Sequence, residues 1–370
     1  MEYIKGFDVS TLEEVERCGG KFYDDGEAED CLAILKRHGA NYLRLRLWND
    51  PYDSLGRDYG AGVCDLPTVL RLAKRGREAG MDWLLDLHYS DFWADPGKQT
   101  VPKAWAGLDT DGLEQAVYAY TKTVCRACVE AGVAPGMVQV GNELTNGLLW
   151  PLGKVPNWEN IARFVKAGIR AVREILPAAR VMVHLDNGGN NELYRTWFDH
   201  FFANGGECDL IGLSYYPFWH GTLEALEYNM RDIAGRYGKE LVIAETSMGF
   251  TLESYARYEG LDDADRKGGA AREALAKGLP WPMTEAGQAD FVRDLLAVIR
   301  RVPGGSGFFW WEPAWIPVPG SGWAKESGWE YVHEKGPGGN EWANQALFDF
   351  EGNTLEALRV IRAYQEAAHG

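Results

Sequence analysis

The sequence predicts an α/β protein that folds as one (β/α)8 TIM barrel, and three observations carry this prediction. Eight short apolar runs are bounded by turn residues, and several are apolar at successive positions, as strands buried on both faces are. Amphipathic stretches with a helical period lie between these runs. The length of 370 residues suits one such barrel with enlarged loops.

The predicted strands and helices alternate along the chain. The strands cover residues 3–10, 41–48, 81–90, 137–144, 181–187, 210–217, 241–247 and 307–315. The clearest helices cover residues 66–79, 113–131, 158–176, 223–237, 285–302 and 355–368. Gly80 and Gly132 follow two of these helices as C-terminal caps, and Thr284 marks the start of another.

Three predicted loops are unusually long, and each follows the C-terminal end of a strand. They cover residues 91–111, 248–282 and 317–342. Active sites of these barrels lie at that end of the strands, and long loops in a compact domain are usually functional or disordered. Because no Pro/Ser-rich linker divides the chain, we expect one catalytic domain over residues 1–370.

The composition of the chain limits which partners the protein can bind and in which compartment it can work. The 38 Lys and Arg residues against 54 Asp and Glu give a net charge of −16, without a basic cluster that could bind phosphates. We therefore expect no nucleic acid partner. We also expect no membrane span, because no run of about 18 apolar residues occurs. The N-terminus lacks a signal peptide, which predicts a cytoplasmic protein, or a secreted one in its mature form.

Two carboxylates at predicted strand ends are the strongest catalytic candidates. Glu143 follows the apolar run MVQVGN, and Glu245 follows LVIA, on strands that lie on opposite walls of the barrel mouth. Glycoside hydrolysis needs a proton-carrying acid and an ionised nucleophile flanking one bond, about 5–5.5 Å apart in retaining enzymes. The alternative is that either glutamate is only a structural ion-pair partner of Arg44 or Arg46.

Other polar residues at the strand ends fit the same chemistry. Asn142 can donate a hydrogen bond to a sugar 2-hydroxyl. Arg46 and His88 would supply positive charge and hydrogen-bond donors near Glu245, which would keep it ionised. Asp8 ends the first strand, and Asp91 follows the third.

Aromatic residues also gather at or after the strand ends, where the apolar faces of sugar rings can stack on them. They are Trp93, Trp105, Tyr215, Tyr216, Trp219, Trp311 and Trp315. Trp311 is the best stacking candidate, because it lies where the eighth strand ends. Core packing or loop anchoring is the alternative for each of them.

Two other chemistries are compatible with parts of the sequence. Ligands for a metal ion could come from Asp86, His88, His184, Asp186 and the two glutamates, although no compact motif such as HExxH occurs. Cys125 and Cys128 have the spacing of a redox pair but lie within a predicted helix, without a thioredoxin-like context. We expect reduced thiols, no metal and no other cofactor.

Long motifs occur in order along most of the chain, from Lys5 to about Leu355. They are GFDVS (6–10), RLRLWNDP (44–51), LHYSDFWADPGKQ (87–99), QVGNE (139–143), GLSYYP (212–217), WHG (219–221), WEPAW (311–315) and NQALFD (344–349). Together they resemble glycoside hydrolase family 53, the endo-β-1,4-galactanases that cut the galactan side chains of pectin. That family has the retaining (β/α)8 barrel, with the acid/base after strand four and the nucleophile after strand seven.

The resemblance implies a double displacement in which Glu143 is the acid/base and Glu245 the nucleophile. It implies that Asn142 binds the 2-hydroxyl at the cleavage point and that the substrate is β-1,4-galactan or galacto-oligosaccharides. The shell around that sugar would include either Tyr215 or Tyr216. All predicted substrate-binding residues are Asp8, Arg46, His88, Asp91, Trp93, Asn142, Tyr215, Tyr216 and Trp311. We expect the protein to act as a monomer.

One loop departs from the pattern of the family. The resemblance implies that bacterial members often bind calcium in the loop after strand seven. Residues 249–265 carry acidic side chains here, but without the alternating spacing of calcium ligands. We therefore expect no calcium ion in this chain.

Two other functions remain open. A barrel with the same chemistry could act on another β-1,4-polymer such as mannan, xylan or cellulose, which run straighter than galactan because galactose has an axial 4-hydroxyl. The barrel could also bind carbohydrate without catalysis, although both glutamates and Asn142 are present. The polymer that yields reducing ends distinguishes these functions.

Overall fold

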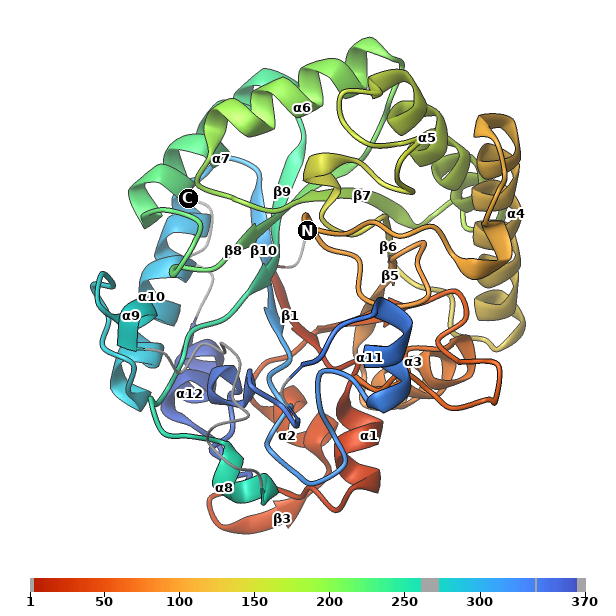
Figure 1. The fold of residues 1–370 in the computed structure, drawn as a ribbon. Helices are drawn as coiled ribbons and strands as arrows, with labels where there is room; N and C mark the ends of the chain where they lie inside the picture. The colour runs from red at the N-terminus through yellow and green to blue at the C-terminus, as the bar shows by residue number, and fades with distance from the viewer. Residues whose placement is uncertain (1–2, 261–272, 337, 365–370) are drawn as a thin grey trace.

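The eight predicted strands form a closed parallel barrel with the helices around it (Figure 1). The computed structural model describes residues 3–260, 273–336 and 338–364. The barrel strands are β1 (Ile4–Asp8), β4 (Tyr42–Leu47), β5 (Asp82–Leu87), β6 (Met137–Val140), β7 (Arg180–Leu185), β8 (Leu210–Tyr215), β9 (Glu240–Thr246) and β10 (Gly305–Trp311). β1 pairs with both β4 and β10, which closes the barrel and confirms the predicted fold class.

Helices separate the strands, as the sequence predicts. The longer ones are α2 (Cys31–Arg37), α3 (Leu66–Glu78), α4 (Thr110–Glu130), α5 (Trp158–Ile175), α6 (Asn191–Ala203), α7 (Leu223–Tyr237), α10 (Glu285–Arg301), α11 (Glu326–Val332) and α12 (Glu356–Ala363). α4 begins three residues earlier than predicted, because the side chain of Asp109 caps it by accepting from the Gly112 amide at 2.8 Å. Of the predicted helix 355–368, residues 365–368 lie outside the described residues.

Several elements are not among those predicted. They are α1 (Leu12–Arg17), α2, α6, α8 (Ala256–Glu259), α9 (Glu273–Ala276), α11 and an antiparallel hairpin of β2 (Phe22–Asp24) and β3 (Glu27–Glu29). The buried residues of α6 are Tyr194, Trp197, Phe198 and Phe201. Their i, i+3, i+4, i+7 spacing is a helical signal that the sequence does contain.

The interior of the barrel changes from apolar to polar along the strands. Its apolar end is filled by Ile4, Leu84, Met137, Met182, Leu210, Val242, Ala244 and Phe309. A Cβ at Gly6 would lie 2.1 Å from the Phe309 ring, so glycine makes room for that ring. Toward the C-terminal ends of the strands, the fully buried residues Asp8, Arg44, Asp86, Gln139 and His184 replace apolar ones. Buried polar groups of this kind need hydrogen-bond or ion-pair partners, and these residues are partners of one another.

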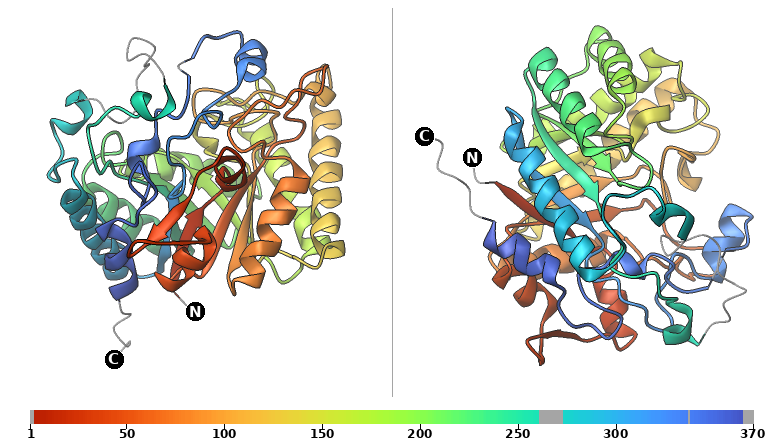
Figure 2. Two further views of the ribbon diagram at one scale, coloured as in Figure 1. Left: turned by 90° about the horizontal axis from the view of Figure 1, so that it is seen from below. Right: turned by 90° about the vertical axis from the view of Figure 1, so that its left-hand side faces the viewer.

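The long loops lie together at the C-terminal end of the strands, as predicted. Figure 2 (left) shows α8 and α11 at that end, opposite the start of β1. α11 lies in the loop after β10, which is fastened to the loop after β4 by ion pairs of 2.7 Å between Arg57 and Glu330 and between Lys325 and Asp58. Among the helices that the structure describes, none combines the length and apolarity that crossing a membrane requires.

Candidate active site

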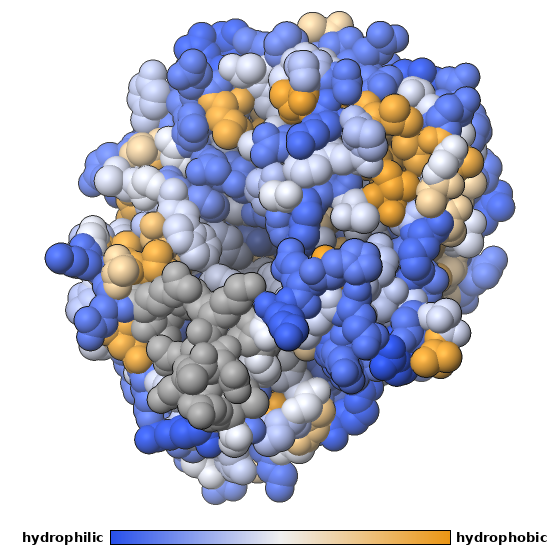
Figure 3. Space-filling view, in the orientation of Figure 1, coloured by the Kyte–Doolittle hydropathy of each residue, from blue (hydrophilic) through white to orange (hydrophobic). Residues whose placement is uncertain are grey.

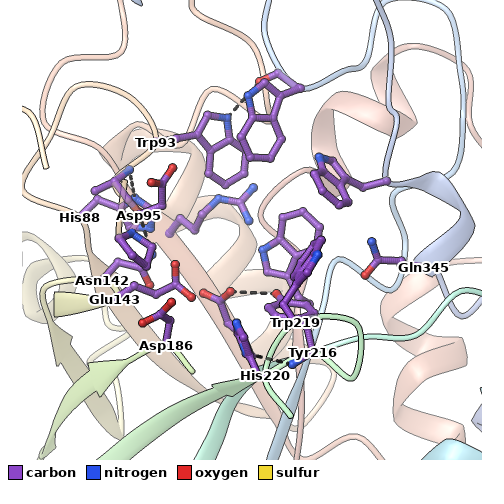
Figure 4. Close-up of a pocket in the computed structure, with 17 residues that line it drawn as sticks. His88, Trp93, Asp95, Asn142, Glu143, Asp186, Tyr216, Trp219, His220 and Gln345 are labelled. Atoms are coloured by element: carbon purple, nitrogen blue, oxygen red, sulfur yellow. Dashed lines mark hydrogen bonds between the residues drawn. The ribbon is translucent and has the colours of Figure 1, made fainter. Parts of the chain in front are cut away.

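A cavity of about 260 Å³ opens at the C-terminal ends of the barrel strands. Figure 3 looks onto this face, which is mostly hydrophilic around a central hollow. In Figure 4, Asn142, Glu143 and Asp186 lie on one side of the cavity, and Tyr216, Trp219 and Gln345 lie on the other. Among the residues predicted for the site, those that line it are Arg46, His88, Trp93, Asn142, Glu143, Tyr216, Glu245 and Trp311.

Glu143 lies at a sharp turn between β6 and the short 3-10 helix Leu144–Asn146. Its backbone adopts the left-handed conformation, with φ 47° and ψ 59°. Non-glycine residues rarely adopt this conformation, which costs on the order of 1 kcal/mol and often occurs at functional sites. Its Oε1 accepts a hydrogen bond from the Ser214 hydroxyl at 2.7 Å.

Burial raises the pKa of Glu143 well above its usual range, and the negative charges of Glu245 and Asp186 raise it further. The hydrogen bond from Ser214 acts in the opposite direction. Among the residues that the structure describes, no Lys or Arg forms an ion pair with Glu143. This environment favours the protonated carboxyl group.

Glu245, the next-to-last residue of β9, lies in a different environment. A 2.7 Å ion pair joins its Oε1 to Nη2 of Arg44, and the Tyr216 hydroxyl donates to its Oε2 at 2.9 Å. Burial raises the pKa of Glu245, and so do the negative charges of Asp86 and Asp8, whereas Arg44 and the Tyr216 hydrogen bond lower it. The cation and the donor favour the ionised form, so the two carboxyl groups of the cavity are held in unlike environments.

The prediction that Arg46 and His88 hold Glu245 ionised is wrong, because Arg44 contacts it instead. The Arg46 guanidinium pairs with Glu312 at 2.6 Å and lies 4.4 Å from the centre of the Trp93 ring. His88 Nε2 lies 3.0 Å from the Asp86 carboxylate. Arg44 and Arg46 both point into the barrel from β4. Arg44 comes two residues earlier in the strand, so it lies deeper below the mouth, among the buried polar residues of the interior. Glu245 therefore forms an ion pair with Arg44, but it also lines the cavity and so is more than a structural ion-pair partner.

Asn142 is fixed by several hydrogen bonds and still has one donor to offer. Its Oδ1 accepts from Nη2 of Arg44 at 2.9 Å and from Nε2 of Gln139 at 3.0 Å. Its Nδ2 donates one hydrogen to the carbonyl of Ala94 at 2.9 Å. An amide carries two such hydrogens, so the second is left for a ligand in the cavity that Asn142 lines.

The structure does not bring three of the predicted site residues to the cavity wall. Asp8 lies beneath it and pairs with Arg44 at 2.8 Å. Asp91 accepts from the backbone amides of Asp50 and Lys103, at 3.0 and 2.7 Å, and thereby anchors a loop.

Tyr215 is the third of these residues, and its hydroxyl donates to the Gly221 carbonyl at 2.9 Å. Successive side chains of a strand point to opposite faces, so Tyr215 points away from the barrel axis when Ser214 and Tyr216 point toward it. Of the two tyrosines, Tyr216 is the one in the cavity.

Four indole rings form an aromatic wall of the cavity. They belong to Trp93, Trp311, Trp323 and Trp342. Trp93 stacks on Trp323 with ring centres 4.2 Å apart and an interplanar angle of 9°. Trp219 lies at the rim and is 45% exposed, which leaves one face of its ring available to a ligand.

Two of the predicted aromatic residues do not line the cavity. Trp315 is buried behind Trp311, and its Nε1 donates to the Ser321 hydroxyl at 3.1 Å. Trp105 packs edge-on against Tyr120. For these two residues the core-packing alternative is correct.

Some lining residues are absent from the predicted site. They include Asp95, Asp186, His220, Trp323, Trp342 and Gln345. Asp95, His220 and Gln345 belong to three of the motifs, and the tryptophans lie in or at the end of the long loop after β10. The motifs could therefore have identified some of these lining residues. The loop tryptophans could not be predicted, because loops have no periodic pattern that fixes the position of a side chain.

The alternative chemistries receive little support. Cys125 and Cys128 are buried within α4, and burial raises the pKa of both thiols to about 12, which opposes thiolate formation. In the part of the chain that the structure describes, no three His, Cys, Asp or Glu side chains are grouped as a metal ion would require. Residues 261–265 of the loop considered for calcium lie outside the described residues.

Comparison with known proteins identifies the family. The family model "Glycosyl hydrolase family 53" matches residues 4–361. An endo-beta-1,4-galactanase of Bacillus subtilis (strain 168) is 40% identical, over 100% of this chain and 87% of the relative. A solved GH53 catalytic domain of Ignisphaera aggregans is 39% identical with a TM-score of 0.89, covering 99% of this chain and 97% of that one. A structure of fungal beta-1,4-galactanases is 31% identical with a TM-score of 0.79, covering 98% and 100%. The chain belongs to glycosyl hydrolase family 53.

Proposed function

We propose that this protein is a retaining endo-β-1,4-galactanase that hydrolyses β-1,4-galactan by double displacement. Two relatives named as galactanases support the substrate class, one by sequence and one by structure. The observation that carries the chemistry is the pair of buried glutamates in one cavity with opposite surroundings. Glu245 pairs with a cation and accepts from a hydroxyl, whereas the carboxyl group of Glu143 accepts from a hydroxyl and has no described cation paired with it.

In the first step, Glu245 attacks the anomeric carbon while Glu143 gives its proton to the departing glycosidic oxygen. The ionised form of Glu245, which Arg44 and Tyr216 favour, supplies the electron pair for the new bond. Protonation of the leaving oxygen by Glu143 completes the cleavage. The products are a galactosyl ester on Glu245 and a free reducing-end fragment.

In the second step, Glu143 has lost its proton and acts as a base. It takes a proton from a water molecule, whose oxygen attacks the anomeric carbon and displaces Glu245. Two inversions restore the β configuration, and both glutamates return to their starting protonation states. The raised pKa of Glu143 suits this alternation between acid and base.

The remaining cavity residues suit a sugar substrate. The free amide hydrogen of Asn142 is placed to donate to the 2-hydroxyl of the sugar at the cleavage point, a contact that strengthens in the transition state. Trp311 offers an indole face to the apolar side of a pyranose ring, with Arg46 and His88 beside it. We further propose that the chain acts as a monomeric single domain, because all these groups come from one barrel.

The test is release of reducing ends from unsubstituted β-1,4-galactan, compared with mannan, xylan and cellulose. We expect activity on galactan alone, and its loss in Glu143→Gln and in Glu245→Gln. Proton NMR of the first product should show the β anomer before mutarotation. Activity on another polymer would show that the proposed substrate class is wrong. Binding without turnover would show that the protein is a carbohydrate-binding barrel and not an enzyme.

A further inference from the structure

The only described side chain that hydrogen-bonds the Glu143 carboxyl group is Ser214, a residue that the mechanism above does not use. Ser214 lies on β8 and is fully buried, with its Oγ 2.7 Å from Oε1 of Glu143. With Oε1 held in this way, Oε2 is the oxygen left to face the cavity. The direction in which Glu143 presents its second oxygen therefore depends on where the Ser214 hydroxyl is.

His184 determines whether Ser214 can donate. Its Nε2 lies 2.9 Å from the Ser214 Oγ. Burial, and then the charge of Arg44, lower the pKa of His184 well below its usual range, so the ring is neutral and carries one N–H. Serine has a single hydroxyl hydrogen. Ser214 can therefore donate to Glu143 while it contacts His184 only if the N–H is on Nε2.

The other side of the His184 ring is consistent with this tautomer. With the hydrogen on Nε2, Nδ1 has a lone pair and can accept from the backbone amide of Glu143 at 3.4 Å, whereas Gln139 has its two amide hydrogens directed to Asp86 at 2.6 Å and to Asn142 at 3.0 Å. Nδ1 also lies 3.0 Å from Oδ1 of Asn142, but that oxygen accepts from both Arg44 and Gln139 and so does not require a hydrogen from His184. One imidazole thus contacts the backbone of Glu143 directly and its carboxyl group through Ser214.

The tautomer also decides which oxygen of Glu143 carries the acid proton. If the hydrogen were on Nδ1, Nε2 would accept from Ser214, and Ser214 could then accept a proton only from Oε1 of Glu143. That proton would point away from the substrate. With the hydrogen on Nε2, Oε1 is an acceptor, so the proton of the acid form resides on Oε2.

We propose that Ser214, oriented by the Nε2–H tautomer of His184, is a positioning residue that holds Oε1 of Glu143 and presents the other oxygen to the glycosidic bond. This inference rests on the proposed function. It assigns a task to residues that lie outside the cavity lining. Ser214 touches neither substrate nor reacting atoms, and it acts through Glu143 alone.

The pH dependence follows from the same contact. Other titratable groups that act on Glu143 are Glu245 from β9, Asp186 and His184 from β7, Asp95 from the loop after β5, Tyr194 from α6 and Tyr216 after β8. Removing the Ser214 hydroxyl leaves these groups in place. It removes a hydrogen bond that favours the ionised carboxylate, so the pKa of Glu143 rises further. Because the acid must be protonated, the basic limb of kcat/KM should move to higher pH.

The test compares Ser214→Ala with Ser90→Ala in the full chain. Ser90 is a matched control, because it is also buried, in the segment after β5, but its hydroxyl has no hydrogen-bond partner among the described residues. Ser214→Ala should lower kcat/KM on galactan about 10- to 100-fold and move the basic limb up by about half a pH unit or more. On a dinitrophenyl β-galactobioside, whose leaving group needs no proton, kcat/KM should fall less than about 3-fold. Ser214→Cys, which keeps a weak donor, should give intermediate values.

Three results would overturn the proposal. Ser214→Ala behaving like Ser90→Ala on galactan would show that the contact does not matter. Equal losses on both substrates would indicate a general structural role. Nitrogen-15 NMR of the unsubstituted protein showing the His184 hydrogen on Nδ1 would remove its physical basis. An inactive wild-type protein would instead contradict the proposed function, which keeps the two failures distinct.

Discussion

The two sides of the cavity hold the same functional group in different electrostatic surroundings. On the β9 side, Glu245 contacts the guanidinium of Arg44 and the hydroxyl of Tyr216. On the β6 side, Glu143 contacts one neutral hydroxyl and faces the acidic groups of Glu245 and Asp186. Both are buried, so burial alone cannot separate their protonation states. The neighbours do so, and the placement of one arginine is the main difference.

The largest expected effect comes from replacing either glutamate by alanine, and the product that each variant forms distinguishes the roles of the two residues. Glu143→Ala and Glu245→Ala should each lose roughly 10⁴-fold in kcat on galactan. With dinitrophenyl β-galactobioside and azide, Glu143→Ala should form the β-galactobiosyl azide, because azide replaces water in the second step. Glu245→Ala should form the α-azide, because azide replaces the nucleophile. NMR of the products identifies each anomer, and the reverse outcome would exchange the two roles.

Removing the positive charge of Arg44 should make the surroundings of Glu245 more like those of Glu143. Arg44→Met takes the positive charge away from Glu245, so the pKa of Glu245 rises and the acidic limb of kcat/KM moves to higher pH. We expect about a 10³-fold loss of activity and a loss of about 3–5 kcal/mol in the free energy of unfolding, since buried acids lose their partner. Arg46→Met is the control, because Arg46 pairs with Glu312 and should leave the acidic limb in place. If both variants move that limb equally, the assignment of Arg44 is wrong.

Neighbouring tyrosines provide a smaller and cleaner comparison. Tyr216→Phe removes the hydroxyl that donates to Glu245, so activity should fall about 10-fold and the acidic limb should rise. Tyr215→Phe removes a hydroxyl that donates to Gly221, which should cost about 1 kcal/mol of stability and leave kcat within about twofold. Steady-state kinetics and urea unfolding of both variants check this. Similar kinetics would mean that the outward position of Tyr215 is incorrect.

The smallest expected effect on catalysis comes from a buried carboxyl group away from the cavity, which tests the role of burial through stability alone. Burial raises the pKa of Glu259 in α8 to about 8, and the backbone amide of Asn340 lowers it in part. A pKa raised above its unfolded value means that the stabilising contribution is complete below about pH 4.5 and is lost as pH rises to about 8. Relative to Glu259→Gln, the wild-type protein should therefore lose unfolding free energy across that range, with a slope of at most about 1.4 kcal/mol per pH unit. Urea unfolding at the two pH values measures this, and equal slopes for both proteins would contradict it.

The barrel and its catalytic end were predictable from the sequence because both follow from periodicity. Apolar runs that alternate with amphipathic helices define the strands, and Glu143 and Glu245 follow two of those runs directly. Strand parity would also have chosen Tyr216 over Tyr215, because side chains alternate across a sheet. The motifs of the family added the roles, which remain predictions for the tests above.

The sequence did not predict how deep a side chain lies below the mouth of the barrel, or how the loops are placed. Arg44 and Arg46 lie on one face of one strand, and which of them meets Glu245 depends on how far each lies below the mouth. Trp323 and Trp342 come from a loop without a periodic pattern, so nothing in their local sequence places them against Trp93 or Trp311. The contact between Ser214 and Glu143 joins two strands and requires the tertiary structure.

The position of β1 between β4 and β10 has a consequence for synthesis on the ribosome. Residues 4–8 leave the exit tunnel early, but their second neighbour, Gly305–Trp311, is made about 300 residues later. At typical elongation rates this interval lasts roughly 15 to 60 s, during which one edge of β1 has no strand to pair with. Unpaired edges promote aggregation of nascent chains. The yield of this protein should therefore depend on translation speed and on chaperones that shield the growing half-barrel.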